Sequence, residues 1–239
     1  MVIEEFNIIY ASVILISLFI ISRIFNVFDL KGSISALFVG YIIAIAGSLY
    51  WLILMIVFAM TSYIATRFRI KEKMENGLQE GKNGERKTSN VMYAAMIGLI
   101  ISLFNVSGLG GFNYFELFAI SFAVVNADTF ASELGVFDKN VFLITNFKRV
   151  KPGINGGVSK LGEASALLGS FIIGITYTIL RYHNFVFYPV LIITFLGFMG
   201  CQIDSVLGAV LENRGKMSKG QVNLTATLIS VIAGIAFIM

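Results

Sequence analysis

Three acidic residues lie in apolar stretches of the sequence that are long enough to cross a membrane. Asp128 and Glu133 fall in one stretch, and Asp204 falls in another. A carboxylate within a bilayer costs several kcal/mol, roughly, so it normally faces a cavity, a metal ion or a partner. Carboxylate oxygens in a chain with a single histidine suit a hard cation, Mg²⁺ above all. We predict that these three acids hold Mg²⁺, with internal salt bridges or polar partners as the alternative.

The residues around Asp128 form a polar wedge, ADTFASELG, at positions 127–135. Successive residues of a helix are offset by about 100°, so the wedge divides between two neighbouring faces. One face carries Asp128, Ser132 and Gly135, and the next carries Asn126, Thr129 and Glu133. In the other stretch Gly197, Gly200 and Gly208 fall on the side of Asp204, where we expect them to clear room around its carboxylate.

A basic, glycine-rich segment follows the wedge and reads TNFKRVKPGINGGVSK at 145–160. Glycines let backbone N–H groups turn toward an anion, and the cations supply charge. A helix that begins near Gly162 would add its N-terminal dipole. We predict a phosphate cradle; a merely solvated loop is the alternative. Its members are Lys148, Arg149, Lys151, Gly153, Gly156, Gly157 and Ser159. We also count Lys148 among the candidate catalytic residues, with Asp128, Glu133 and Asp204.

The composition shows what must position these groups. Of the 239 residues, 57% are hydrophobic and 13% are charged, whereas average chains have about 45–50% and about 25%. These values exclude a soluble globular protein, a disordered chain and a nucleic-acid-binding domain. The single histidine excludes His-cluster metal sites and most Ser/His catalysis. The chain is a multi-span integral membrane protein.

The apolar runs predict an all-α transmembrane bundle of about eight spans, because each run has the length of a membrane helix and lacks a two-residue alternation. The expected spans are 6–22, 33–49, 50–66, 91–107, 114–135, 162–181, 185–210 and 222–239. We expect one transmembrane domain over 1–239, with loops near 67–90, 136–161 and 211–221. Eight spans place 17 of the 18 Lys and Arg residues on one side. The positive-inside rule makes that side cytoplasmic and puts both termini outside.

Taken together, the wedge, the segment ITNFKRVKPGINGGVS at 144–159 and DSVLGA at 204–209 resemble one family of integral membrane proteins. It contains plant phytyl-phosphate kinase and the animal transmembrane protein nineteen. GERKTSNV at 84–91 and the region of Asn223 fit more loosely, and the first two spans carry little of the pattern. Phe130 stands where many members have Trp, and Ile154 where a small polar residue is common.

The resemblance implies phosphoryl transfer from a nucleoside triphosphate, CTP, to an isoprenoid monophosphate, which gives a prenyl diphosphate. Asp128 and Asp204 would then hold Mg²⁺, with Glu133 as a third ligand or a nucleotide contact. The cations of the glycine-rich segment would bind the triphosphate, and Arg67 and Arg86 would bind the acceptor phosphate or the nucleotide. The partners would be membrane lipid, the isoprenoid phosphate and the nucleotide, at a site that faces the cytoplasm.

Two other functions share some of these features. A secondary transporter also places acids in the membrane, but it predicts midplane acids and an internal repeat. A lipid cytidylyltransferase would use the same metal and CTP but release pyrophosphate. The prenyl chain length, the nucleotide preference and the oligomeric state stay open at this point.

Overall fold

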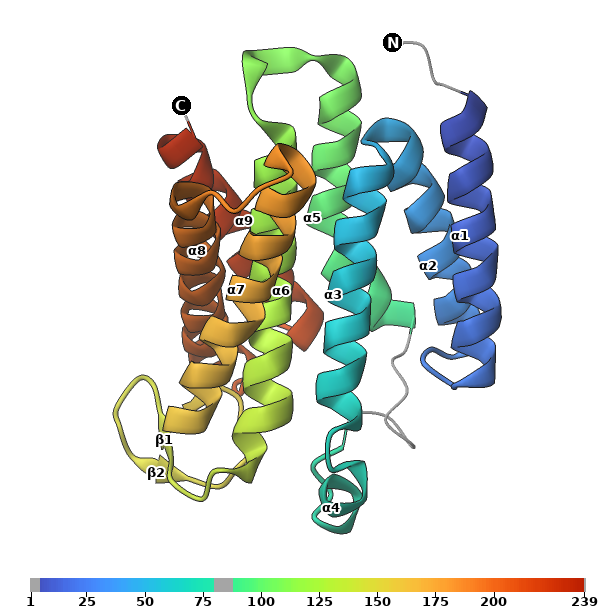
Figure 1. Ribbon diagram of the computed structural model, residues 1–239. Helices are drawn as coiled ribbons and strands as arrows, with labels where there is room; N and C mark the ends of the chain where they lie inside the picture. Colours follow the sequence, from blue (N-terminus) through green and yellow to red (C-terminus); the bar gives the residue numbers. More distant parts are fainter. Residues whose placement is uncertain (1–4, 80–87, 239) are drawn as a thin grey trace.

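The computed structural model describes residues 5–79 and 88–238, and the chain folds into a bundle of long helices (Figure 1). The long helices are α1 (Glu5–Ile24), α2 (Leu30–Ala46), α3 (Leu49–Arg67), α5 (Thr88–Ser107), α6 (Tyr114–Leu134), α7 (Lys160–Tyr182), α8 (Phe187–Leu207) and α9 (Lys219–Ile238). Long helices that follow one another along the chain alternate in direction, so α1 begins and α9 ends at the same end of the bundle. The prediction of an all-α polytopic bundle is confirmed.

Five of these helices are long and apolar enough to span a membrane, and the apolar helices over Ile8–Ile24, Leu30–Ala46 and Met92–Ser107 are somewhat shorter. Among the described residues, each of the eight predicted stretches therefore holds an apolar helix, but only five of these helices have the length of a membrane span. The boundary between the second and third spans lies near Gly47, where α2 ends at Ala46 and α3 begins at Leu49. Helix α2 begins at Leu30, earlier than predicted, because the Asp29 carboxylate caps it by accepting from the Gly32 N–H at 2.6 Å.

Helix α6 is the axis of the bundle, and its sides pack against α3, α5, α7, α8 and α9. Its apolar residues point in all directions, as expected of a helix surrounded by others. Phe118 and Phe122 are fully buried, and Phe118 also stacks obliquely on Trp51 of α3 with ring centroids 4.6 Å apart. The polar wedge therefore belongs to the most enclosed helix in the molecule.

Small residues bring the surrounding helices close to α6. A Cβ at Gly197 would lie 2.8 Å from Ala123 Cβ, and one at Gly200 would lie 2.5 Å from a Val124 methyl. These glycines of α8 therefore serve helix packing. The expectation that they clear room around Asp204 is wrong for Gly197 and Gly200, whereas Gly208 does border the space beside Asp204.

One end of the bundle carries shorter elements. After the 3₁₀ turn η2 (Gly135–Phe137), the strands β1 (Val141–Leu143), β2 (Arg149–Val150) and β3 (Gly157–Val158) form an antiparallel sheet in the order β2-β1-β3. The short helix α4 (Ile70–Glu75) follows α3, and the π-helical turn η3 (Gly208–Glu212) extends α8. The predicted loop at 136–161 is thus a small sheet that lies beside the start of α7.

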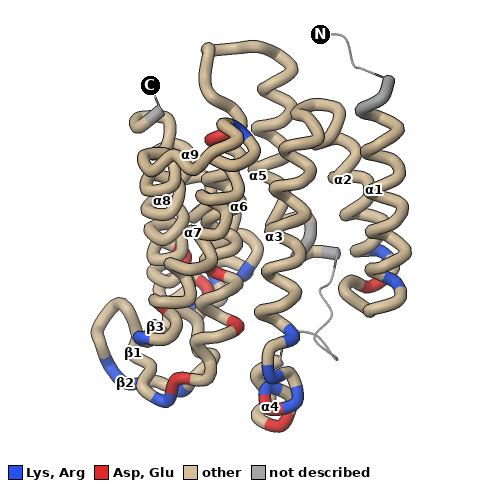
Figure 2. Tube along the Cα trace, viewed as in Figure 1, with Lys and Arg blue, Asp and Glu red and all other residues tan. Residues whose placement is uncertain are grey.

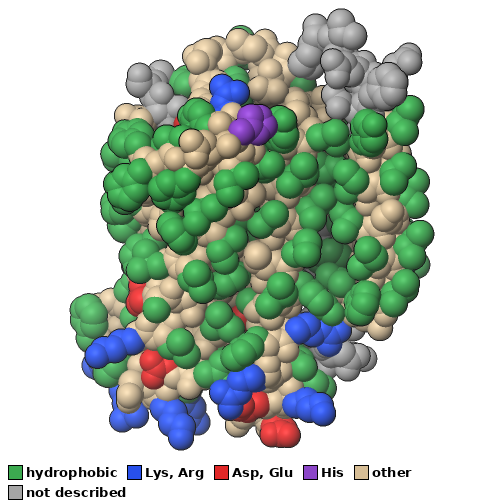
Figure 3. All heavy atoms as spheres, viewed as in Figure 1, with side chains coloured by type: hydrophobic (Ala, Val, Ile, Leu, Met, Phe, Trp, Pro, Cys, Tyr) green, Lys and Arg blue, Asp and Glu red, His purple; other side chains and the backbone are tan. Residues whose placement is uncertain are grey.

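Charge is distributed unevenly along the bundle. Lys and Arg gather at the end that carries α4 and the sheet, while the middle of the bundle is nearly free of them among the described residues (Figure 2). The space-filling view shows a broad hydrophobic surface above this charged end (Figure 3). A hydrophobic belt between two polar ends is what a bilayer-spanning bundle requires.

Candidate functional site

A polar cavity of about 260 Å³ opens at the charged end of the bundle, between α6, α7, α8 and the sheet. Its lining includes five carboxylates, which are Asp128, Glu133, Glu163, Asp204 and Glu212. Lys219, at the start of α9, also lines it. Among the described residues, carboxylates thus outnumber cations around this cavity, so it favours a cation or a ligand that arrives with one.

Asn223 of α9 lies between the two predicted metal-binding aspartates. One end of its carboxamide is 2.7 Å from Asp204 Oδ2, and the other is 3.4 Å from Asp128 Oδ2. When the amide nitrogen donates to Asp204, the amide oxygen faces the Asp128 carboxylate. A cation between these two oxygens would stabilise this arrangement. Three helices therefore bring Asp128, Asp204 and Asn223 to one point.

The glycine-rich segment is fixed against α8 beside this point. Gly156 has φ +77°, and a Cβ there would lie 2.6 Å from the Ser205 carbonyl oxygen and 2.5 Å from Ala209 Cβ. Only glycine allows both this backbone conformation and this approach. Gly153, Gly156 and Gly157 all line the cavity. The glycines of this segment therefore lie beside the acidic residues of the cavity.

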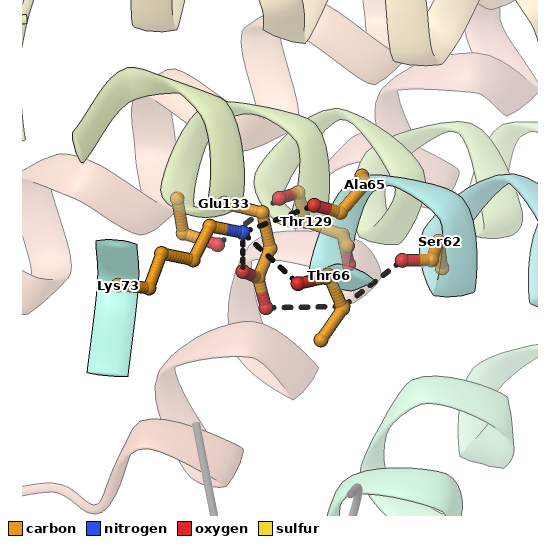
Figure 4. Close-up of polar contacts among 7 residues, drawn as sticks. Ser62, Ala65, Thr66, Lys73, Thr129 and Glu133 are labelled. Carbon is orange, nitrogen blue, oxygen red and sulfur yellow. Dashed lines mark hydrogen bonds and ion pairs between the residues drawn. The ribbon is translucent and has the colours of Figure 1, made fainter. Parts of the chain in front are cut away.

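Glu133 binds a threonine of α3 and a lysine of α4 (Figure 4). Its Oε1 accepts a hydrogen bond from Thr66 at 3.0 Å, and its Oε2 pairs with Lys73 Nζ at 2.6 Å. Lys73 is fully buried, and it also donates to the carbonyls of Ala65 and Thr66, which end α3. Since both carboxylate oxygens are engaged, Glu133 is better described as the partner of Lys73 than as a metal ligand.

The rest of this face of α6 is also structural. Asn126 is buried, accepts from Ser62 at 3.1 Å and donates to the Gly169 carbonyl at 2.8 Å. Thr129 is buried one turn further along, next to Glu133 (Figure 4). The two predicted faces of the wedge therefore have different surroundings. Asp128 and Ser132 line the cavity, whereas Asn126 contacts α3 and α7 and Glu133 of the same face lies at the cavity wall.

The predicted basic residues do not converge on the cavity. Lys148, Arg149 and Lys151 are exposed on the sheet and are not among the residues that line it. Arg149 instead donates to the Asn140 side chain at 3.1 Å. Arg67 contacts α1 and its own helix, with its guanidinium bound to the Phe25 carbonyl and the Tyr63 hydroxyl. Arg86 lies outside the described residues.

The start of α7 closes one side of the cavity and is capped twice. The Ser159 hydroxyl accepts from the Gly162 N–H at 3.1 Å, so it caps this helix. Asp138 Oδ2 accepts from the Leu161 N–H at 3.4 Å. The pKa of Asp138 is lowered, mainly because the Asn140 N–H donates to its carboxylate. Ser159 thus caps and positions α7. Lys219 is the cationic side chain among the described residues that line the cavity.

Four lining residues did not stand out in the sequence, namely Lys219, Glu163, Glu212 and Gln79. Lys219 could have been found, because it precedes Asn223 by four residues and so shares its helical face. Glu163 and Glu212 stand at span ends, where acidic residues are common. Gln79 Oε1 is buried and accepts no hydrogen bond from the described part of the chain.

The sequence profile of an integral membrane protein family, DUF92, matches residues 13–237, which is nearly the whole chain. The chain belongs to the DUF92 family. This confirms the family resemblance seen in the acidic wedge and the glycine-rich segment, and it establishes an integral membrane protein. No solved structure matches the chain.

Several curated proteins are similar to this DUF92 chain. The membrane protein MJ0933 of Methanocaldococcus jannaschii is 30% identical over 87% of this chain and 84% of its own length. Protein PGR of Arabidopsis thaliana is 38% identical over 39% of this chain and 36% of its own length. Protein VTE6 of Arabidopsis thaliana, a chloroplastic protein, is 30% identical over 46% of this chain and 34% of its own length. The similarity to the plant proteins is therefore partial.

Proposed function

We propose that this DUF92 protein is a membrane-embedded kinase that transfers a phosphoryl group from CTP to an isoprenoid monophosphate. The observation that carries the proposal is the point where Asp128, Asn223 and Asp204 meet beside a glycine-lined cavity. Phosphoryl transfer to a prenyl phosphate is supported by the resemblance of the acidic wedge and the glycine-rich segment to the family that contains phytyl-phosphate kinase. The coarser form of the proposal is that this protein acts in prenyl-lipid metabolism.

The residues of the cavity fit a divalent ion. Asp128 and Asp204 would hold Mg²⁺, since this ion is commonly bound by one or two carboxylates together with substrate phosphates and water. Among the described residues no three His, Cys, Asp or Glu side chains form a metal cluster, so the ion would need the substrate phosphates and water as its other ligands. The unpaired Gln79 oxygen offers a further polar contact. When bound, Mg²⁺ would neutralise charge on the phosphate oxygens.

The transfer needs positioning more than a strong base. An acceptor phosphate oxygen attacks the γ-phosphorus, the bond from that phosphorus to the β–γ bridging oxygen breaks, and CDP leaves with the electron pair. The acceptor oxygen is already ionised near neutral pH, because the second pKa of a phosphate monoester is about 6. Lys219 would contact the phosphates, and Gly153, Gly156 and Gly157 would let them approach the backbone.

A product assay on the purified, detergent-solubilised protein tests the proposal. Geranylgeranyl or phytyl monophosphate is supplied with Mg²⁺ and CTP, and then with ATP, GTP or UTP. We expect prenyl diphosphate and CDP, both abolished by EDTA and by Asp128→Asn. Glu75→Gln, which changes an exposed carboxylate on α4, is the matched control and should retain activity.

Other products would redirect the assignment. Pyrophosphate in place of CDP would identify a cytidylyltransferase acting at the same metal site. No product with any nucleotide would overturn the kinase, and an ion flux in liposomes that depends on Asp128 and Asp204 would then favour a transporter.

A further inference from the structure

An apolar groove of about 340 Å³ runs between α1, α2 and α3, on the opposite side of α3 from the polar cavity's acids. Figure 3 shows the surface hollowed along the boundary between α3 and the α1–α2 pair. On α3 the groove extends from Met55 to Ile64, which is about 14 Å at about 1.5 Å per residue. Its walls are apolar apart from Tyr63 and the serines Ser22 and Ser33, which bond each other at 2.9 Å.

The groove continues inward as a narrower cavity of about 80 Å³. The two spaces share six lining residues, which are Val27, Phe28, Ala36, Met55, Ala59 and Tyr63. The inner cavity reaches α5 and α6, and its lining includes Ser62 and Thr66, whose hydroxyls donate to Asn126 and Glu133. An apolar path therefore leads from the lipid-facing surface to a polar end that these two residues form inside the bundle.

That polar end meets the wall of the polar cavity. Thr66 lines the inner apolar cavity and donates to Glu133, and Glu133 lines the polar cavity. The buried Lys73 ammonium sits on the same carboxylate. A single layer of side chains, Thr66 with the Lys73–Glu133 pair, thus separates the apolar path from the site proposed for the nucleotide.

Cations flank the charged-end mouth of the groove. Arg67 ends α3 and holds the carbonyl of Phe25, while Arg23 in the last turn of α1 holds the carbonyl of Phe28. Phe25 and Phe28 both line the groove. An apolar path with cations at one mouth is complementary to an amphiphile that has an anionic head.

We propose that this groove holds the hydrocarbon chain of the isoprenoid phosphate, with its head toward Arg67 and Thr66. The inference rests on the proposed function and assigns the acceptor its place in the fold. Together the groove and the inner cavity, about 340 Å³ and about 80 Å³, are too small for the two long chains of a diacyl lipid. The occupant that we propose is a single-chain isoprenoid with a phosphate head, and Lys73 stands where that phosphate would approach the nucleotide site.

Photolabelling in lipid nanodiscs tests this placement independently of catalysis. The probe is geranylgeranyl monophosphate with a diazirine at the end of its chain, and labelled peptides are located by mass spectrometry. We expect label on α1, α2 and α3, removed by unlabelled geranylgeranyl monophosphate. Ala59→Phe and Ala36→Phe, which fill the groove from two helices, should each abolish that label. Ala233→Phe, at an exposed position of α9, should retain it.

The outcomes separate the groove from the kinase. Label in the groove without any prenyl diphosphate in the product assay would support the binding site and overturn the proposed function. Prenyl diphosphate formation with label on α8 and α9 would overturn the groove and leave the kinase standing. Equal competition by dioleoyl phosphatidic acid would also overturn the inference, because it would identify a site for bulk anionic lipid.

Discussion

At the scale of single residues, the Lys73–Glu133 ion pair is the interaction among the described residues whose disruption should cost the most stability. The side chain of Lys73 is 0% exposed and that of Glu133 is 7% exposed. Removal of one partner from a buried ion pair leaves an uncompensated charge and costs about 3–5 kcal/mol. We therefore expect Lys73→Met to lower the midpoint of thermal unfolding in detergent markedly.

The same helix provides the control for this change. Lys71 is exposed on α4, so Lys71→Met makes the same substitution without burying a charge and should leave the midpoint nearly unchanged. The double change Lys73→Met with Glu133→Leu should recover part of the loss, since an apolar pair can replace a buried ionic one. Equal midpoints for Lys71→Met and Lys73→Met would contradict the pairing.

The two aspartates bridged by Asn223 should act as one unit. We expect Asp128→Asn and Asp204→Asn each to lower kcat by about 100-fold or more, as removal of a charge-stabilising group does elsewhere. Because either change would disable the proposed Mg²⁺ site, the double variant should be little slower than the single ones. Initial rates of CDP release measure this. Multiplicative losses would show that the carboxylates serve separate sites.

The free-energy cost of placing a charged side chain in an apolar run explains which site residues could be predicted from the sequence. Asp128 and Asp204 stand out because acids in apolar runs demand a reason, and the structure brings them together. Lys73 did not stand out, because its segment carries many charges, and only the fold shows that it turns inward. The basic residues Lys148, Arg149 and Lys151 were predicted to bind phosphate at the site. In the structure they lie on a short strand and its turns and are exposed to solvent.

At the scale of elements, the contact between the glycine-rich segment and α8 sets the shape of the polar cavity. We expect Gly156→Ala to push the segment away from Ser205 and Ala209, because its Cβ would lie within 2.6 Å of atoms from both. Backbone strain at a positive φ adds about 1–2 kcal/mol. Activity and the unfolding midpoint should both fall.

Gly215 is a control that separates the effect of backbone strain from the effect of the contact with α8. It has φ +66°, and a Cβ added there would meet no heavy atom within 4 Å, so Gly215→Ala carries the strain alone. It should lower stability modestly and leave the Michaelis constant for CTP unchanged, whereas Gly156→Ala should raise it. Identical kinetics for the two variants would mean that the packing on α8 has no part in nucleotide binding.

The elements differed in how far they could be predicted. The long apolar runs predicted the helices well, because a segment in lipid must form all of its backbone hydrogen bonds within itself. The sheet at 141–158 was missed, because strands of two or three residues are too short to show a periodicity. The place of the apolar groove between α1 and α3 could not be predicted, because it depends on how the helices pack and not on any single run.

At the scale of the whole molecule, the polar cavity and most of the described cations share one end of the bundle. The positive-inside rule assigns that end to the cytoplasm. The proposed reaction requires the same orientation, because nucleoside triphosphates are cytoplasmic. Lys148 on the sheet and Asn184 after α7 are exposed at opposite ends, so they report the orientation.

A membrane-impermeant maleimide applied to intact cells tests this orientation. The native Cys201 is buried, so the unmodified protein should stay unlabelled until it is denatured. Asn184→Cys should be labelled from outside, and Lys148→Cys only after the membrane is opened. The reverse pattern would place the cavity outside the cell, away from CTP. Kinase activity in the purified protein would then lack a donor in the cell, and the proposed role would fail even though the chemistry held.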